Sequence, residues 1–385
     1  MTRRAYLDHN ATSPLRPEAR AAMFDALETL GNPSSVHAEG RAAKALLEDA
    51  RAAVARAIGG PRRGIVFTSG ATEAASLALS PALRRDGDAS PTDVLLIGAG
   101  EHLCVMQGHR FPRDMVETVP LTSEGTISLE ALTAALARRA GARVMLSLQA
   151  VNNETGVIQP VAEAAALIHA ANGVVVCDAV QSLGRRETTF ASTDADILFF
   201  SSHKLGGPMG VGALAFRDES LHLDAPMLRG GGQEFGRRAG TENVSGIAGF
   251  AAALTAATTV VAGEGSRLAD LRDELERQVL KIAPDSRFYG LGAPRAPNAS
   301  AFTIPGLAAR TMLMALDLEN VALSAGSACS SGKMMESHVL AAMGAAEKEA
   351  LRASFGWSST QEDVELFGKV LARVVDRMRS RHPAA

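Results

Sequence analysis

Short apolar runs alternate with segments of helical periodicity over the first two-thirds of the chain, and this alternation restricts the fold more than any other feature. The runs are the strands that we expect: IVFT (65–68), DVLLIG (93–98), RVMLSLQ (143–149), GVVVCD (173–178), DILFFS (196–201) and VGALAF (211–216). Because most of them are continuously apolar, they suit strands that are covered on both faces. The pattern predicts an α/β fold with a mostly parallel mixed sheet between layers of helices.

The pattern changes after about residue 260. A charged amphipathic segment, 264–282, is long enough to bridge two domains, and shorter strand-like pieces follow it. The final helix should begin near Thr360, with Asp363 placed for a capping box. We expect two domains: a large one over residues 16–260, and a small α+β domain made of residues 1–15 and 261–385.

Composition narrows the class of protein. Of the 385 residues 46% are hydrophobic and 21% are charged, and the net charge is −3, so nothing favours nucleic acid or an anionic membrane. Three cysteines cannot form a disulfide framework, and residues 1–8 are unlike a secretory or transit segment, so we expect a cytoplasmic protein. The uncharged segment 243–263 consists mostly of small residues, which predicts a tightly packed helix and not a membrane span.

Polar residues follow the strand-like runs, and ligands of an open α/β sheet bind beyond the carboxyl ends of its strands. The first run is followed by a small-residue turn, 69–73, at the start of a helix, where N–H groups favour a phosphate. The next runs are followed by a histidine, an asparagine, an aspartate with a glutamine, and a lysine: His102, Asn153, Asp178, Gln181 and Lys204. Together these residues predict one site.

This set of residues fits pyridoxal phosphate. The amine of Lys204 can form a Schiff base with the aldehyde of that cofactor. Asp178 ends an apolar strand, where a carboxylate without a cationic partner is costly, and a pyridinium supplies such a partner. The phosphate suits the turn at 70–72, and an imidazole can stack on the ring.

Longer motifs carry a resemblance to a known family. They occur in one order over nearly the whole chain: YLDHNATSPLRPEA, GNPSSVHAEGR, FTSGATEAASLAL, VNNETGVIQP, CDAVQSLG, SSHKLGGPMGVGAL, GGGQEFGRRAGTENV and SAGSACSSG. The chain resembles the cysteine desulfurases of the NifS/IscS type, in the class V aminotransferase group of fold type I pyridoxal phosphate enzymes. The resemblance implies pyridoxal 5′-phosphate as cofactor, a homodimer, and removal of sulfur from L-cysteine to leave L-alanine.

Matched position by position, the resemblance also implies roles for single residues. Lys204 matches the Schiff-base lysine, Asp178 the partner of the pyridinium nitrogen, and His102 the ring-stacking histidine, which can also move protons. The remaining cofactor matches are Asn153 and Gln181 for the phenolic oxygen, and Ala71, Thr72, Ser201, His203 and Thr241 for the phosphate. Thr241 would reach the phosphate across the dimer interface.

The resemblance extends to the substrate and the sulfur. Cys329, in SAGSACSSG, matches the cysteine that takes up sulfur as a persulfide. Arg352 matches the arginine that binds the substrate carboxylate, which suits its bidentate fork, and Asn10 is placed at the substrate with it. No metal is implied, and the sulfur would pass to an acceptor such as an iron–sulfur cluster scaffold protein. We expect Cys177 and Cys104 to be packing residues.

Other functions stay open at this point. A selenocysteine lyase or another class V aminotransferase would use the same cofactor residues, but an aminotransferase would not need Cys329. An inactive sulfur-relay or scaffold-binding subunit, which is a different class of protein, would keep the fold without the chemistry. The products formed from L-cysteine and the visible absorbance of a bound cofactor separate these possibilities.

Overall fold

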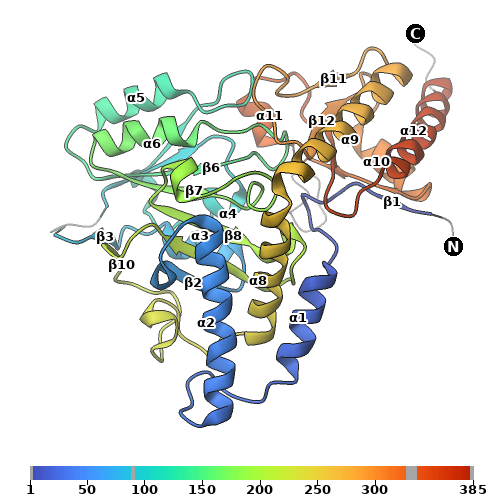
Figure 1. Cartoon of the computed structure of the whole chain (residues 1–385). Coiled ribbons are helices and arrows are strands. Elements are labelled where there is room, and N and C mark those ends of the chain that lie inside the picture. Colours follow the sequence, from blue (N-terminus) through green and yellow to red (C-terminus); the bar gives the residue numbers. More distant parts are fainter. Residues whose placement is uncertain (1–2, 88–91, 327–335, 382–385) are drawn as a thin grey trace.

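A seven-stranded sheet is the centre of the computed structural model, which describes residues 3–87, 92–326 and 336–381 (Figure 1). The strand order is β2-β9-β8-β7-β6-β4-β5. The strands are β2 (Ile65–Thr68), β4 (Val94–Gly98), β5 (Val116–Val119), β6 (Val144–Gln149), β7 (Val174–Asp178), β8 (Ile197–Ser201) and β9 (Gly212–Phe216). Of these strands β9 runs antiparallel to its neighbours, while the others are parallel. The prediction of an α/β fold with a mostly parallel sheet is confirmed.

Helices cover both faces of this sheet, since successive side chains of each strand point to opposite sides. Leu95 and Leu96 of β4, for example, belong to two different cores. The helices on the Leu96 side are α2 (Ala38–Ile58), α5 (Leu129–Arg138), α6 (Val161–Ala170) and α8 (Val244–Thr259), and those on the Leu95 side are α3 (Ala71–Ala78) and α4 (Leu103–Met106). Burial on both faces explains why the strand sequences are continuously apolar.

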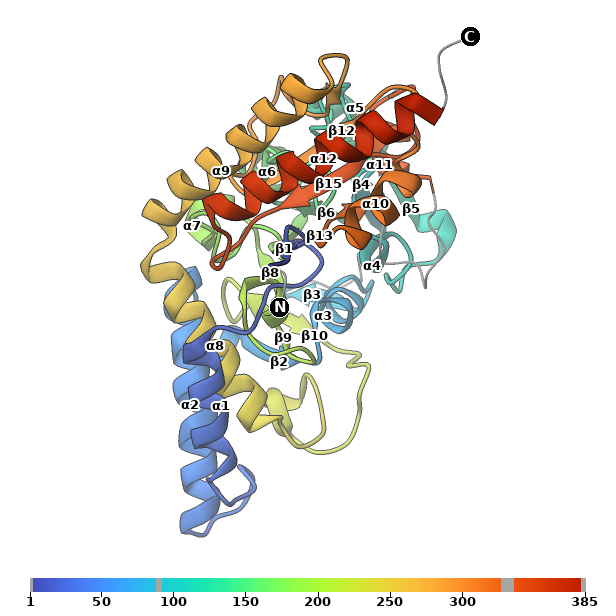
Figure 2. The same cartoon turned by 90° about the vertical axis from the view of Figure 1, so that its right-hand side faces the viewer.

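The uncharged segment forms α8, which packs against α2 and α1 (Pro17–Leu27). Helices α1 and α2 project away from the sheet as an arm, with α8 beside them (Figure 2). Close approach depends on small residues, because a Cβ at Gly249 would lie 2.4 Å from the Cγ of Met23. The expectation of a tightly packed helix is confirmed.

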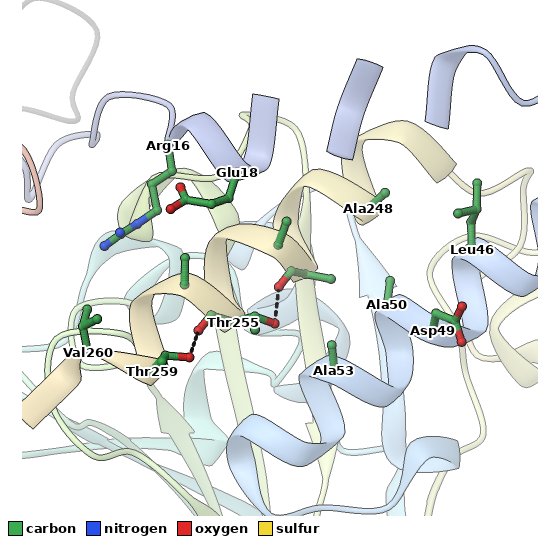
Figure 3. A pocket seen from close by; sticks show the side chains of 13 residues that line it. Arg16, Glu18, Leu46, Asp49, Ala50, Ala53, Ala248, Thr255, Thr259 and Val260 are labelled. Carbon is green, nitrogen blue, oxygen red and sulfur yellow. Dashed lines mark hydrogen bonds between the residues drawn. The ribbon is translucent and has the colours of Figure 1, made fainter. Parts of the chain in front are cut away.

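A groove of about 700 Å³ lies between these three helices and is lined largely by alanines (Figure 3). Charged side chains at its edges include Glu18 and Asp49. The hydroxyls of Thr255 and Thr259 donate to carbonyl oxygens of their own helix. Among the described residues, this lining includes no histidine, cysteine or lysine.

Helix α9 (Val261–Ile282) continues from α8 after a bend of 76° and leads to the C-terminal part of the chain (Figure 1). It packs beside the last helix, α12 (Gln361–Arg381). No single helix in the described ranges has the length and apolar character to cross a membrane; by those two criteria alone, the bent pair α8 and α9 does pass.

The C-terminal part is built on a second sheet with its own core. This sheet has the order β11 (Arg287–Phe288), β12 (Ala299–Thr303), β15 (Leu351–Ser354) and β14 (Ser324–Ala325). The N-terminal strand β1 (Ala5–Tyr6) pairs in parallel with β13 (Val321–Ala322), beside α10 (Ala309–Leu318) and α12. The first residues thus pack with the last third of the chain, although the exact division into two domains stays a prediction.

The last helix begins with only half of the expected capping box. Asp363 accepts a hydrogen bond from the backbone N–H of Thr360 at 2.9 Å, but the Thr360 hydroxyl donates to the same carboxylate. A capping box needs that hydroxyl to accept from the N–H of residue 363. Arg3 changes the arrangement, because its guanidinium donates to both side chains.

Candidate active site

Lys204 lies in a short 3-10 turn directly after β8. Its Nζ donates to the backbone oxygens of Asn10 at 2.6 Å and Ala11 at 2.7 Å. Its own backbone oxygen accepts from Ser13 Oγ at 3.0 Å and from Nη2 of Arg185 at 2.9 Å. The segment that follows β1 therefore crosses the end of β8 and meets the amine.

Asp178 ends the neighbouring strand β7 and is buried. Its Oδ1 accepts from the N–H of Val180 at 2.8 Å. Burial raises the pKa of Asp178 to about 7, although this N–H and the charge of Lys204 both act to lower it. The charge of Lys204 thus affects the pKa of Asp178, so the two side chains are near each other. One ligand that contacts both side chains requires such proximity.

A second buried carboxyl, Glu101, lies near Asp178, and no motif assigned it a role. Its Oε1 accepts from the N–H of Gln149 at 2.6 Å, while Oε2 has no hydrogen-bond partner among the described residues. Burial, and then the charge of Asp178, raise the pKa of Glu101 well above its ordinary value. Burial thus disfavours negative charge on Glu101, and the neighbouring Asp178 disfavours it further.

His102 precedes α4, and its ring is neutral at pH 7. Nδ1 accepts from the backbone N–H of Cys104 at 3.1 Å, so the ring proton is on Nε2. Burial lowers the pKa of His102 to about 4, and the charges of Lys204, His338 and Arg352 add to this effect. A neutral ring can stack on an aromatic ligand, and its Nε2–H can donate a hydrogen bond.

The turn that precedes α3 has the features of an anion site. No side chain caps this helix, so its first N–H groups, at Ala71 and Thr72, point outward. A Cβ at Gly70 would lie 3.9 Å from Ser201 Oγ, which places that hydroxyl against the turn. Gly212 of β9 permits this packing, since a Cβ there would come within 2.7 Å of Gly70. Three of the predicted phosphate ligands thus lie together.

The other two predicted phosphate ligands differ in exposure. His203 is partly buried, its Nδ1 lies 3.1 Å from Thr12 Oγ1, and burial, followed by nearby cationic charge, lowers its pKa to about 4. Thr241 is exposed and makes no side-chain hydrogen bond within the described part of the chain. Its loop is held near α3 by Arg238, whose Nε lies 2.9 Å from Oε1 of Glu73.

The two adjacent asparagines have different roles. Asn152 accepts hydrogen bonds from the N–H groups of Glu154 and Thr155 at 2.9 Å, which shapes the turn. The backbone oxygen of Asn153 accepts from Arg352 at 2.9 Å. The carboxamide of Asn153 makes no hydrogen bond to the described residues, so it is available to a ligand.

Arg352 reaches the site from β15 of the second sheet. Its Nη2 donates to Oδ1 of Asp8 at 2.8 Å, and its Nη1 donates to Asn153. Its Nε is buried and has no acceptor among the described residues. Asn10 is also buried, and its Nδ2 donates to the backbone oxygen of Asn153 at 3.2 Å. A fixed guanidinium with a donor to spare suits a carboxylate ligand.

The thiols fall into two groups. Cys177 and Cys104 are buried, as we expected for packing residues, and burial raises the pKa of Cys177 well above its ordinary value. Cys329, the predicted sulfur acceptor, lies outside the described residues. No group of three or more metal-ligating side chains occurs within the described ranges.

The residues present fit pyridoxal phosphate. A buried carboxyl that lacks a cationic hydrogen-bond partner matches a pyridinium, and an uncapped helix start with a serine hydroxyl matches a phosphate. The amine of Lys204 is near both the neutral imidazole of His102 and the Asp178 carboxyl, since its charge lowers the pKa of each. The predicted residues other than Thr241 and Cys329 therefore lie around one location.

The chain is similar to known proteins over nearly its whole length. Residues 5–367 match the family model described as aminotransferase class-V. The chain is 37% identical to a cysteine desulfurase from Cereibacter sphaeroides, over 99% of this chain and 98% of the relative. It is 36% identical to cysteine desulfurase IscS from Dictyoglomus turgidum, over 100% of this chain and 97% of the relative. The solved structure of a NifS-like protein from Rickettsia africae has a TM-score of 0.85 and 32% identity, and the match covers 97% of this chain and 100% of that one.

Proposed function

Because the chain belongs to the class V aminotransferase family, as a cysteine desulfurase of the NifS and IscS type, we propose a specific task for each residue of this site. The enzyme removes sulfur from L-cysteine and leaves L-alanine. The observation that carries the assignment is that Lys204 and Asp178 act on each other beside an uncapped helix start.

Pyridoxal phosphate, when bound, supplies a ring that withdraws electrons from the substrate Cα. Asp178 would hold the ring N–H, and Lys204 would hold the aldehyde carbon. The groups that would hold the rest are His102 for the ring face, Asn153 and Gln181 for the phenolic oxygen, and Ala71, Thr72, Ser201 and His203 for the phosphate.

The side chains then bind the substrate and move its protons. Arg352 pairs with the carboxylate of cysteine, and Asn10 supports it through the shared contact to Asn153. The Nζ of Lys204 takes the proton from Cα. The Nε2–H of His102 can donate a hydrogen bond in the site, because Nδ1 accepts the N–H of Cys104. This neutral ring can pass a proton on only after it has first taken one up.

We propose that Cys329 receives the sulfur. Its thiolate attacks the substrate sulfur, a sulfur–sulfur bond forms, and the Cβ–S bond breaks with its electron pair left on the carbon side. Cβ gains a proton to become the methyl group of alanine, and Cys329 keeps the sulfur as a persulfide. An ordinary thiol is mostly protonated at pH 7, so a base must first remove its proton.

We propose that the enzyme is a homodimer. Large apolar side chains of α1 and of the loop after it are exposed, namely Phe24, Leu27, Leu30 and Val36. Isolated exposed apolar residues are common, but a group of them on one projecting arm is typical of an interface. Exposure of Thr241 also supports this proposal, because a residue that reaches a neighbouring site must be on the surface.

The destination of the sulfur is a further proposal. The name IscS of one relative supports an iron–sulfur cluster scaffold protein as the acceptor. The small number of cysteines supports a cytoplasmic location, where thiols stay reduced.

The test of this function follows the sulfur. Incubation with L-cysteine should produce alanine and place one extra sulfur atom on the peptide that contains Cys329, detected by mass spectrometry. The Cys329→Ser variant should keep the visible absorbance of the cofactor and form no persulfide, whereas the control Cys104→Ser should still form it. Full sulfide release by Cys329→Ser would contradict the assignment, and transamination of a keto acid would indicate an aminotransferase.

A further inference from the structure

Arg185 is a buried guanidinium at the centre of the site, and no motif assigned it a role. Its Nη1 donates to Oδ1 of Asn10 at 2.9 Å and to Oε1 of Gln181. Its Nη2 donates to the backbone oxygens of His9 and Lys204, both at 2.9 Å. One side chain therefore ties together the N-terminal segment, the turn after β7 and the lysine turn.

None of the hydrogen bonds of this cation goes to a carboxylate within the described part of the chain. Burial, and then the charge of Arg352, lower the pKa of Arg185 to about 9, which leaves it cationic at pH 7. A buried charge that only neutral oxygens solvate costs free energy. We therefore expect the Arg185 guanidinium to have a role in the site that offsets this cost.

The bonds of Arg185 determine which way two carboxamides face. An amide side chain has a donor end and an acceptor end, whereas a guanidinium only donates. The oxygens of Gln181 and Asn10 must therefore point toward Arg185. Nε2 of Gln181 points the other way and donates to the backbone oxygen of Asn10 at 3.0 Å.

The same backbone oxygen also accepts from Nζ of Lys204 at 2.6 Å. The NH₂ group of Gln181 and the amine of Lys204 thus converge on one atom. If the carboxamide of Gln181 turned over, it would direct NH₂ at the guanidinium, leave the donor unsatisfied and present an oxygen toward the lysine. Arg185 prevents that orientation.

We propose that Arg185 is a positioning residue that keeps the NH₂ group of Gln181, and not its oxygen, directed to the cofactor site beside Lys204. The inference rests on the proposed function, since the group to be met is the phenolic oxygen of pyridoxal phosphate. An ionised oxygen requires a donor, and a second oxygen in its place would repel it. Arg185 acts through Gln181 and does not touch the reacting atoms.

The experiment is a double-mutant cycle on Arg185→Met and Gln181→Ala. The readouts are the dissociation constant of pyridoxal phosphate, from titration of the cofactor-free protein, and the pH midpoint of the visible band of the bound cofactor. Arg185→Met should weaken binding about tenfold or more, as expected for loss of a hydrogen bond to an ionised group, and shift the midpoint. In the Gln181→Ala background the same change should have little further effect on either readout.

Two controls separate positioning from general stability. Arg110→Met removes a half-buried guanidinium whose hydrogen bonds within the described residues go to the backbone oxygens of Ala225 and Leu77. This change should leave both readouts unchanged. If Arg185→Met does not fold, Arg185→Lys replaces it in the cycle, since an ammonium keeps the charge but cannot bridge both amides.

The outcomes are distinct. Additive effects in the cycle, or unchanged readouts in a folded Arg185 variant, would overturn the positioning role. Lys204→Ala serves as the reference for the proposed function itself. If Lys204→Ala binds the cofactor with the wild-type band, the proposed function fails; if that variant loses the band and Arg185 variants keep it, only the positioning role fails.

Discussion

Asp8 and Arg352 form a partly buried ion pair, with Oδ1 and Nη2 2.8 Å apart, between the segment after β1 and strand β15. The pair holds the guanidinium in one orientation, while its Nε remains without an acceptor among the described residues. The arginine that we propose for substrate binding is thus held in place by a residue 344 positions away in the sequence.

Replacement of Arg352 by lysine should weaken substrate binding. A lysine cannot bond Asp8, the Asn153 oxygen and a substrate carboxylate together, because it lacks the planar fork. We expect the KM for L-cysteine to rise about tenfold or more, which corresponds to ~1.4 kcal/mol, with a smaller change in kcat. Asp8→Asn should raise the KM less. Steady-state alanine formation measures both, with Arg287→Lys on exposed β11 as the control. An unchanged KM in Arg352→Lys would exclude this role.

Asp178 should make the stability of the cofactor-free protein depend on pH. Its pKa is about 7 in the fold and about 3.9 in an unfolded chain. As the pH rises through this interval the unfolded chain releases the proton first, so the free energy of unfolding falls. Asp178→Asn cannot ionise. The cofactor-free variant should therefore melt at a higher temperature than the wild type at pH 8, with a smaller difference at pH 5.

Bound pyridoxal phosphate should reverse this order. The pyridinium then stabilises the Asp178 carboxylate, and the wild type should melt above Asp178→Asn at pH 8. Thermal unfolding with and without the cofactor measures the reversal, and the exposed Asp114→Asn serves as control. The same order in both states would show that this carboxyl does not face the cofactor.

Glu234 should be essential for the loop that carries Thr241. Glu234 and Phe235 both have positive φ, at 47° and 59°, a conformation that non-glycine residues rarely adopt. The Glu234 carboxylate is buried and accepts two bonds from Arg51, at 2.8 and 2.9 Å. Its removal leaves both Nη groups of the buried Arg51 without a carboxylate partner. We expect Glu234→Ala to lower the free energy of unfolding by about 3–5 kcal/mol, measured by chemical denaturation.

The chain offers a matched control for Glu234→Ala. Glu48 pairs with Nε of Arg51 at 3.2 Å, but its side chain is 41% exposed. Glu48→Ala should therefore cost less than about 1 kcal/mol. Equal losses in the two variants would mean that the buried pair does not hold the loop.

The sequence predicted the sheet because continuously apolar strands report burial on both faces. It also predicted the edge of the sheet at which Lys204, Asp178 and His102 act on one another, since parallel strands end on one side. The half-formed capping box could not be foreseen, because Arg3 approaches Thr360 from the other end of the chain.

Arg185 and Glu101, which support the site, also could not be predicted from the sequence, because their positions depend on segments far away in the chain. Arg185 is followed by Arg186 in the sequence, and only the fold shows that the first of them is buried beneath the N-terminal segment. Glu101 is adjacent to His102, but its burial against Asp178 depends on the neighbouring strands. Local patterns reveal strands and their ends, whereas long-range packing selects the residues that orient a site.

The central claim is that the amine of Lys204 holds pyridoxal phosphate opposite Asp178. Reduction of the purified enzyme with borohydride, followed by proteolysis and mass spectrometry, tests it most directly, because reduction makes the bond between lysine and cofactor permanent. We expect a pyridoxyl group on the peptide that contains Lys204. A cofactor fixed to another lysine, or an active enzyme with no labelled lysine, would contradict it.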